Sequence, residues 1–110
     1  MAYLYEHAAV VRLIDGDTVV LDIDLGNHLV WRDSFRLYGL NTPERGKPGA
    51  SEATAALAAL LAPGLVRVQT HKPDKYGRWL VDLWVAAGHV NQLLIAGGHA
   101  KPYSGHGPRT

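Results

Sequence analysis

Residues 10–25 read VVRLIDGDTVVLDIDL, and this stretch predicts the first β-hairpin of the chain. The β-branched run Val10–Ile14 favours a strand, and Asp15-Gly16-Asp17 supplies the residues of a tight turn. From Thr18 to Leu25 apolar and polar residues alternate, as they do in a strand with one buried face. The buried face is predicted to carry Val19, Leu21, Ile23 and Leu25.

The segments that follow predict a third strand and then a helix. The turn Gly26-Asn27 leads into the apolar stretch Leu29–Leu40, so the first three strands form a meander. Residues 41–50 contain two prolines and two glycines and are therefore predicted to be a loop. A helix is expected next, with Ser51 as its N-cap and Pro63-Gly64 as its stop.

Two more strands and a second helix complete the pattern. Leu65–Thr70 and Trp79–Val85 are predicted strands, and Val90–Ala96 is a predicted short helix. Five strands, with a helix between the third and the fourth, predict a mostly β, α+β domain built on a five-stranded Greek-key barrel with two helices. We expect one domain over residues 1–110, with a core of about 10–103 and a loose tail at 104–110.

Length and composition agree with one globular domain and exclude several classes of protein. The chain has 110 residues, of which 47% are hydrophobic and 19% are charged. It has no cysteine, which excludes disulfides and thiolate metal sites. No apolar run approaches the roughly 20 residues that cross a bilayer, and the N-terminal residues lack the pattern of a signal peptide. We therefore expect no membrane partner and a cytoplasmic location, with a phage-encoded protein as one origin.

The charge balance favours a local site over a charged surface. With 11 Lys and Arg against 10 Asp and Glu, the formal net charge is +1, so attraction to phosphate has to come from individually placed arginines. Three polar segments stand out from their surroundings. They are Asp15-Gly16-Asp17-Thr18, Arg36 with Asn41-Thr42-Pro43-Glu44, and Asp74-Lys75-Tyr76-Gly77-Arg78.

Each segment has a structural and a functional interpretation. The first is a hairpin turn or a source of carboxylate ligands, although its spacing does not fit an EF-hand. Arg36 lies in an apolar strand and needs an anion, which is either a carboxylate of the protein or a phosphate of a ligand. Glu44 is a solvated loop residue or a functional group. Lys75–Arg78 is a polar turn or a nucleotide contact.

Taken together and in this order, the three segments resemble the signatures of the staphylococcal nuclease (thermonuclease) family. The resemblance covers about Val10–Tyr103 and includes Ile14–Val19, Val90-Asn91 and Gly98-His99-Ala100. It implies an OB-fold domain that hydrolyses phosphodiester bonds in single- or double-stranded DNA, in RNA or in both. It also implies that Ca²⁺ is the cofactor and that the products carry a 3′-phosphate and a 5′-hydroxyl.

The resemblance implies a role for each matching residue. Asp17 matches a calcium ligand, and Thr42 matches a ligand that binds through its backbone carbonyl. Glu44 matches the general base for the attacking water, and Arg36 and Arg78 match the two arginines that hold the scissile phosphate. The other matches are Asp15, an acid near the metal, and three nucleotide-contacting residues, Lys75, Tyr76 and Tyr103.

The chain departs from the family pattern at one metal ligand. Asn41 stands where the family's best-known member has an aspartate, so one negative charge is lost. Either metal binding is weaker or Asp15 compensates for the lost charge. The oxygen donors suit Ca²⁺, with Mg²⁺ or Mn²⁺ as alternatives, better than Zn²⁺. The six histidines are interpreted as surface or packing residues. We expect the third, C-terminal helix of long-form nucleases to be absent, and a monomer or weak oligomer.

Two functions therefore compete. The first is a metal-dependent nuclease in which a glutamate activates water and two arginines hold the phosphate. The second is a catalytically weak or inactive OB-fold module that binds nucleic acid. Relatives that only bind typically lose the arginines or the glutamate, so the presence of Arg36, Glu44 and Arg78 favours the nuclease.

Overall fold

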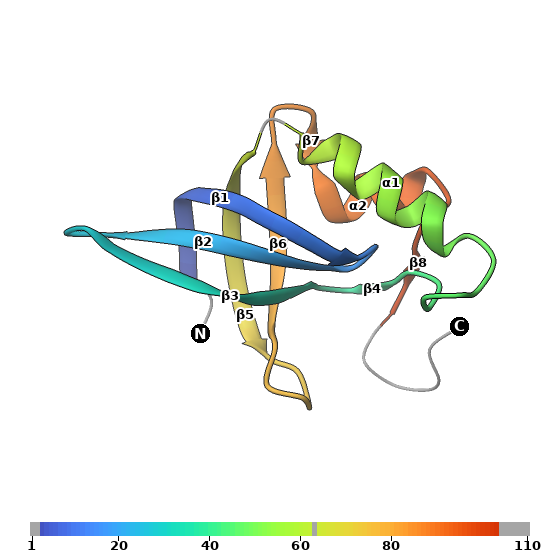
Figure 1. The fold of residues 1–110 in the computed structure, drawn as a ribbon, viewed down its shortest axis with the longest axis horizontal. Coiled ribbons are helices and arrows are strands. Elements are labelled where there is room, and N and C mark those ends of the chain that lie inside the picture. The colour runs from blue at the N-terminus through green and yellow to red at the C-terminus, as the bar shows by residue number, and fades with distance from the viewer. Residues whose placement is uncertain (1–2, 63, 104–110) are drawn as a thin grey trace.

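Five strands close into a barrel in the computed structural model, which describes residues 3–62 and 64–103 (Figure 1). The predicted tail, residues 104–110, and Pro63 of the predicted helix stop lie outside the described residues. The barrel strands are β1 (Tyr3–Asp15), β2 (Thr18–Gly26), β3 (Leu29–Leu37), β5 (Leu65–Pro73) and β6 (Trp79–Val85). The other elements are β4 (Leu40–Asn41), α1 (Ala50–Leu60), β7 (Gly88–His89), α2 (Val90–Ala96) and β8 (Lys101–Pro102).

The order of the strands is that of a closed Greek-key barrel. Antiparallel pairing runs in the order β3, β2, β1, β5, β6, and a parallel pairing between β3 and β6 closes the ring. In the closing pair Phe35 lies opposite Trp79, and Arg36 lies opposite Leu80. Helix α1 connects the third barrel strand, through β4, to the fourth. This topology confirms the predicted α+β fold with a five-stranded OB-type barrel.

The hydrophobic core fills the barrel and extends under the two helices. Val19, Leu21 and Ile23 of β2 are fully buried, as the alternation predicts. Leu57 of α1 and Leu94 of α2 join the same core, at the end of the barrel where both helices lie (Figure 1). Among the described residues, no helix is long and apolar enough to cross a membrane.

Leu25 of β2 is exposed, although it was predicted to lie on the buried face. Its side chain is 45% exposed, because the β2–β3 hairpin projects beyond the barrel, away from the helices (Figure 1). Leu29 and Val30, on the returning strand, are also exposed. Alternation therefore identified the residues that face the core but not the point at which the core ends. It also did not predict that Thr18 and Val20, on the opposite face of β2, are buried as well.

Four predicted boundaries also differ from the structure. Strand β5 continues to Pro73, three residues beyond the predicted end at Thr70. Strand β1 begins at Tyr3 instead of Val10, and its added residues pair with β5. The third strand ends at Leu37, because Gly39 takes a φ of 81° and turns the chain into β4. Ser51 is not the N-cap of α1. The cap is Gly49, whose carbonyl accepts the Ala53 N–H at 3.0 Å, so Ser51 lies within the first turn.

The turn between β1 and β2 packs closely against the segment after β4. A Cβ atom added to Gly16 would lie 2.9 Å from the Cβ of Ala53 and 3.0 Å from the Oγ1 of Thr42. Only glycine leaves room for this approach without a shift of the neighbouring atoms. The turn therefore holds Asp17 beside Thr42, two residues that the sequence predicts to act together.

Asn91 joins helix α2 to the barrel and is only 2% exposed. Its Oδ1 accepts the Leu83 N–H at 3.1 Å. Its Nδ2 donates to the carbonyls of Tyr38 and Val81, each at 3.0 Å. One side chain thus serves three backbone groups on two chain segments, which makes it a structural residue.

We expect the substitution Asn91→Ala to lower the free energy of unfolding by about 3 kcal/mol, because it leaves the buried Leu83 N–H without an acceptor. Urea unfolding, with an unchanged m-value, measures the loss. The control is Gln92→Ala on the exposed side of the same helix, which should leave the midpoint nearly unchanged. Equal midpoints for both variants would show that these three hydrogen bonds are dispensable.

Candidate active site

A buried ion pair lies where the β1–β2 turn meets the end of β3. Asp17 is fully buried, Arg36 is 8% exposed, and Asp17 Oδ2 is 3.5 Å from Arg36 Nη2. Asp17 Oδ2 also accepts the Thr42 N–H at 3.3 Å, and Oδ1 accepts the Thr18 hydroxyl at 3.1 Å. Arg36 therefore has the anionic neighbour that its place in an apolar strand requires.

The chain after β3 wraps around the Arg36 guanidinium. Nη2 donates to the carbonyl of Leu40 at 3.3 Å and to Oδ1 of Asn41. The centre of the Tyr103 ring lies 5.9 Å from the guanidinium carbon, within the range of a cation–π contact. The Tyr103 N–H donates to the Gly39 carbonyl at 2.9 Å, which holds the C-terminal segment at this place. The site thus joins segments that are far apart in the sequence.

The predicted metal ligands are among the residues in this cluster. Asp17 and Thr42 are linked by their hydrogen bond, and Asn41 contacts Arg36. Asp15 Oδ1 accepts the Asp17 N–H at 3.1 Å and so shapes the turn. Within residues 3–62 and 64–103, no group of three or more His, Cys, Asp or Glu side chains could hold a metal ion. The candidate donors are instead one carboxylate, one amide and one backbone carbonyl, and oxygen donors of this kind fit a hard cation.

Glu44 lies in the exposed loop that follows β4. Its carbonyl accepts the Lys47 N–H at 2.9 Å, which closes a turn within the loop. The next residue, Arg45, donates from Nη2 to the Ile14 carbonyl at 2.7 Å and ties the loop to the β1–β2 turn. Arg45 is not predictable as a structural contact, because an arginine in a loop of prolines and glycines carries no sequence signal of its partner.

Asp74 organises the turn between β5 and β6. Its Oδ1 accepts the N–H groups of Tyr76 and Arg78 at 2.8 and 3.0 Å. Its Oδ2 lies 2.9 Å from both Nε and Nη2 of Arg78. Burial raises the pKa of the Asp74 carboxyl, but these N–H groups and the charge of Arg78 lower it more, so the pKa lies below its ordinary value of 3.8. Asp74 therefore positions Arg78. The sequence motif alone did not predict this role for it.

The same turn carries an exposed aromatic ring between two cations. Tyr76 is 73% exposed. The Lys75 ammonium lies 5.3 Å from the centre of its ring, and the Arg78 guanidinium carbon lies 5.6 Å from it. Both are cation–π distances, so Lys75, Tyr76 and Arg78 form one cluster that presents a ring and two positive charges to solvent.

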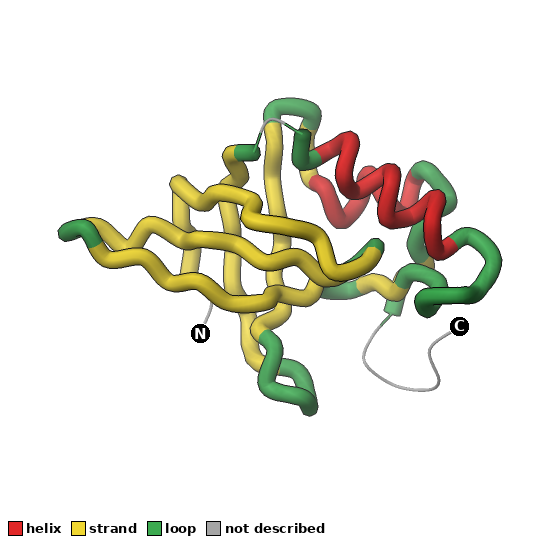
Figure 2. The backbone as a smooth tube through the Cα atoms, in the orientation of Figure 1, coloured by secondary structure: helices red, strands yellow, loops and turns green. Residues whose placement is uncertain are grey.

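The parallel pairing of β3 with β6 sets the position of the Arg36 cluster relative to the cluster of Lys75, Tyr76 and Arg78. Trp79, which follows Arg78, lies opposite Phe35, which precedes Arg36. Figure 2 shows the loop between β5 and β6 below the barrel and the loop after β4 at the side where the helices lie. Arg36 is bonded to Asp17, Leu40 and Asn41, whereas Arg78 is bonded to Asp74 within the β5–β6 turn. The predicted site residues therefore form two clusters, one around Arg36 and one that consists of Lys75, Tyr76 and Arg78.

The chain is similar in sequence to one protein family and to several known proteins. Residues 34–110 match the family described as Staphylococcal nuclease homologue. The chain is 33% identical over 100 residues to Thermonuclease of Staphylococcus hyicus, an alignment that covers 84% of this chain and 56% of the relative. It is 31% identical over 99 residues to an uncharacterized endonuclease of Escherichia coli O157:H7, covering 88% and 61% of the two chains. It is 32% identical over 107 residues to Protein ParB of Escherichia coli, covering 89% and 58%. The chain therefore spans less than two thirds of the length of these relatives.

We expect Asp74→Asn to lower the free energy of unfolding by about 1 kcal/mol at neutral pH, since its partly screened bonds to the Arg78 turn weaken. Because the folded pKa of Asp74 is depressed, its stabilisation is present above pH 3.8 and is lost as the pH falls through the lower folded value. Urea unfolding from pH 7 to pH 3 measures the difference between the two proteins, which should shrink toward acid.

The control for this prediction is Asp22→Asn. Asp22 also accepts two bonds from an arginine, Arg32, but that pair is exposed on the hairpin of β2 and β3. Its loss should change stability much less than the loss of Asp74. A difference between wild type and Asp74→Asn that stays constant down to pH 3 would contradict the assignment of the pKa shift.

Proposed function

Because the chain belongs to the staphylococcal nuclease family, we propose that it is a metal-dependent nuclease that hydrolyses phosphodiester bonds of DNA, RNA or both. The observation that carries the proposal is the pair of Asp17 and Arg36, buried beside Asn41 and Thr42. A buried ion pair is costly to desolvate and contributes little to stability when an apolar pair could replace it. A binding role for these charges explains their place better than a structural one.

We propose that one divalent cation, Ca²⁺ in the first instance, binds to the carboxylate of Asp17, the amide oxygen of Asn41 and the carbonyl of Thr42. Oxygen donors and water suit such a hard cation. When bound, it would stabilise negative charge on the reacting phosphate. Asp15 supports the arrangement through its bond to the Asp17 N–H.

The reaction assigned to the side chains is attack of water on the phosphorus atom. The exposed carboxylate of Glu44 takes a proton from the water as its oxygen forms the new bond. The bond from phosphorus to the 5′-oxygen breaks, this oxygen leaves with the bonding electrons and takes a proton from solvent water, and the products are a 3′-phosphate and a 5′-hydroxyl. Arg36 and Arg78 bind the nonbridging oxygens, where negative charge increases.

The aromatic and cationic side chains near these arginines are assigned to bind the nucleotides on either side of the scissile phosphate. Tyr103 packs over Arg36, and Tyr76 lies between Lys75 and Arg78. Rings of this kind stack on bases of any sequence, and lysine adds charge for the backbone. This arrangement supports contacts to nucleotides next to the bound phosphate.

A second candidate function is a nucleic-acid-binding module with little or no catalysis. One observation favours it, because the amide of Asn41 accepts a hydrogen bond from Arg36 and brings no negative charge for a cation. Both functions use the same surface. They differ in whether the phosphodiester bond is cleaved when a divalent cation is supplied.

We expect the purified protein to cleave single-stranded DNA in the presence of Ca²⁺. Cleavage should stop when EDTA is added, because EDTA removes the cation. Glu44→Gln and Arg78→Lys should each lower the rate about 100-fold or more, because each removes a group that acts in the transition state. Lys47→Gln, a charge change in the same exposed loop as Glu44, is the control and should retain activity. Binding without cleavage in any metal would favour the second candidate function.

We expect Asn41→Asp to bind Ca²⁺ about tenfold more tightly, a gain of about 1.4 kcal/mol, because the added carboxylate supplies charge to the site. Isothermal titration calorimetry measures the affinity without any reaction. Gln92→Glu adds the same charge on the exposed side of α2 and should leave the affinity unchanged. An equal gain in both variants would mean that net charge, and not the position of Asn41, sets the affinity.

A further inference from the structure

Four rings outside the candidate active site gather around one carboxylate. Asp82 Oδ2 is 2.5 Å from His71 Nε2, and Oδ1 is 2.7 Å from His89 Nε2. His71 stacks on Tyr38, with ring centres 4.3 Å apart, and His89 stacks on Trp84, with centres 5.0 Å apart. Asp82 therefore fixes both imidazoles and, through them, two stacked ring pairs.

This cluster lies on the outer face of β6, the strand that pairs with Arg36. Val81 and Leu83 are fully buried in the barrel, so the alternate residues of β6, including Asp82 and Trp84, face outward. Arg36 also points outward, because its neighbours on β3 are buried, and it lies opposite Leu80. From Leu80 to Trp84 the strand rises roughly 13 Å, which is about four nucleotides of a stacked single strand.

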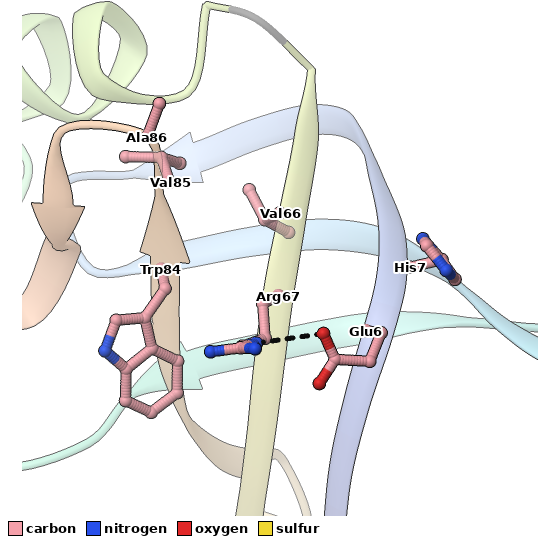
Figure 3. Close-up of a pocket in the computed structure, with 7 residues that line it drawn as sticks. All are labelled: Glu6, His7, Val66, Arg67, Trp84, Val85 and Ala86. Carbon is pink, nitrogen blue, oxygen red and sulfur yellow. Dashed lines mark hydrogen bonds and ion pairs between the residues drawn. The ribbon is translucent and has the colours of Figure 1, made fainter.

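An open pocket lies at the far end of this face, with a volume of about 300 Å³. The polar and aromatic side chains that line it are Trp84, Arg67, Glu6 and His7, and the apolar ones are Val66, Val85 and Ala86. Figure 3 shows the Arg67 side chain between the Trp84 ring and Glu6. Arg67 lies opposite Trp84 in the β5–β6 pairing, and its Nε is 3.1 Å from Glu6 Oε2. The pocket thus combines an aromatic wall with one cation.

We propose that this ring surface, formed by Tyr38, His71, His89, Trp84 and Arg67, binds a single nucleic-acid strand as it continues from the candidate active site. The proposal rests on the proposed function, in which Arg36 binds a phosphate of the same strand. The ring surface begins beside that phosphate and ends at the pocket of Arg67. It extends the contact along the outside of β6 without a role in cleavage.

Two features make the ring surface suited to an unpaired strand. Base faces are covered by neighbours in a duplex but are available in a single strand, where they stack on aromatic rings whatever their sequence. The ring planes are already held by Asp82, so little side-chain freedom is lost on binding. Tyr38 is 42% exposed, and the histidine side chains are partly exposed.

The two acidic residues on this face do not prevent binding of phosphate. Both oxygens of Asp82 are occupied by imidazole nitrogens, and its side chain is only 15% exposed. Glu6 pairs with Arg67 at the surface, where both side chains are about half exposed. Exposed ion pairs of this kind are weak in water, so Arg67 can exchange the carboxylate for a phosphate.

The test measures binding of fluorescein-labelled oligothymidylates of two and ten nucleotides by anisotropy, in the Glu44→Gln background with Ca²⁺. We expect Trp84→Ala and Arg67→Ala each to weaken binding of the ten-nucleotide strand about tenfold and to leave the dinucleotide unaffected. Trp84→Phe should retain most of the affinity. Tyr3→Ala, which removes an exposed ring from β1, is the matched control and should change neither affinity.

The outcomes separate this inference from the proposed function. Unchanged affinity of the ten-nucleotide strand in Arg67→Ala, an exposed position that does not threaten folding, together with cleavage by the wild-type protein, would overturn the ring surface alone. Loss of affinity for both lengths would also overturn it, because the effect would then lie at the phosphate site. Failure of the wild-type protein to bind or cleave either strand would overturn both proposals.

Discussion

Burial of the Arg36 guanidinium is the constraint on which the candidate site depends. A charge placed between Phe35 and Leu37, both buried in the barrel, has to be matched by acceptors that come from elsewhere in the chain. Asp17 reaches it from the β1–β2 turn and Asn41 from β4. Three other features bring groups to this side chain. Gly16 allows the β1–β2 turn to approach closely, the chain after β3 folds around the guanidinium, and Tyr103 of the C-terminal segment packs against it.

The fold and the site were predictable to different depths. Alternation and turn residues are local signals, so the hairpin of residues 10–25 and both helices were correctly placed. The predicted burial of Leu25 was wrong, because periodicity does not show where other residues cover a face. The predicted N-cap Ser51 was also wrong, because the helix begins after Gly49, which caps it without a side chain. The need of Arg36 for an anion was visible in the sequence. The bond from Arg45 to Ile14 was not, because such contacts arise only when separate strands and loops are brought together.

The two arginines of the proposed mechanism are held in different ways. Arg36 is fixed by groups from several segments and is almost fully buried. Arg78 is held by Asp74 within one turn, and its side chain is about one third exposed. The buried arginine therefore has a defined position before any ligand arrives. The exposed one, with Lys75 and Tyr76, can adjust to a bound strand without disturbing the barrel.

Closure of the barrel through β3 and β6 has a consequence for the order in which the protein folds. The meander of β1, β2 and β3 joins neighbours in the sequence, and it alone brings Asp17 close to Arg36, because Thr18 pairs with Arg36. The contact of Phe35 with Trp79 closes a much longer loop, whose entropy must be overcome first. The Asp17–Arg36 pair can therefore form early in folding, before the pairing of β3 with β6 closes the barrel.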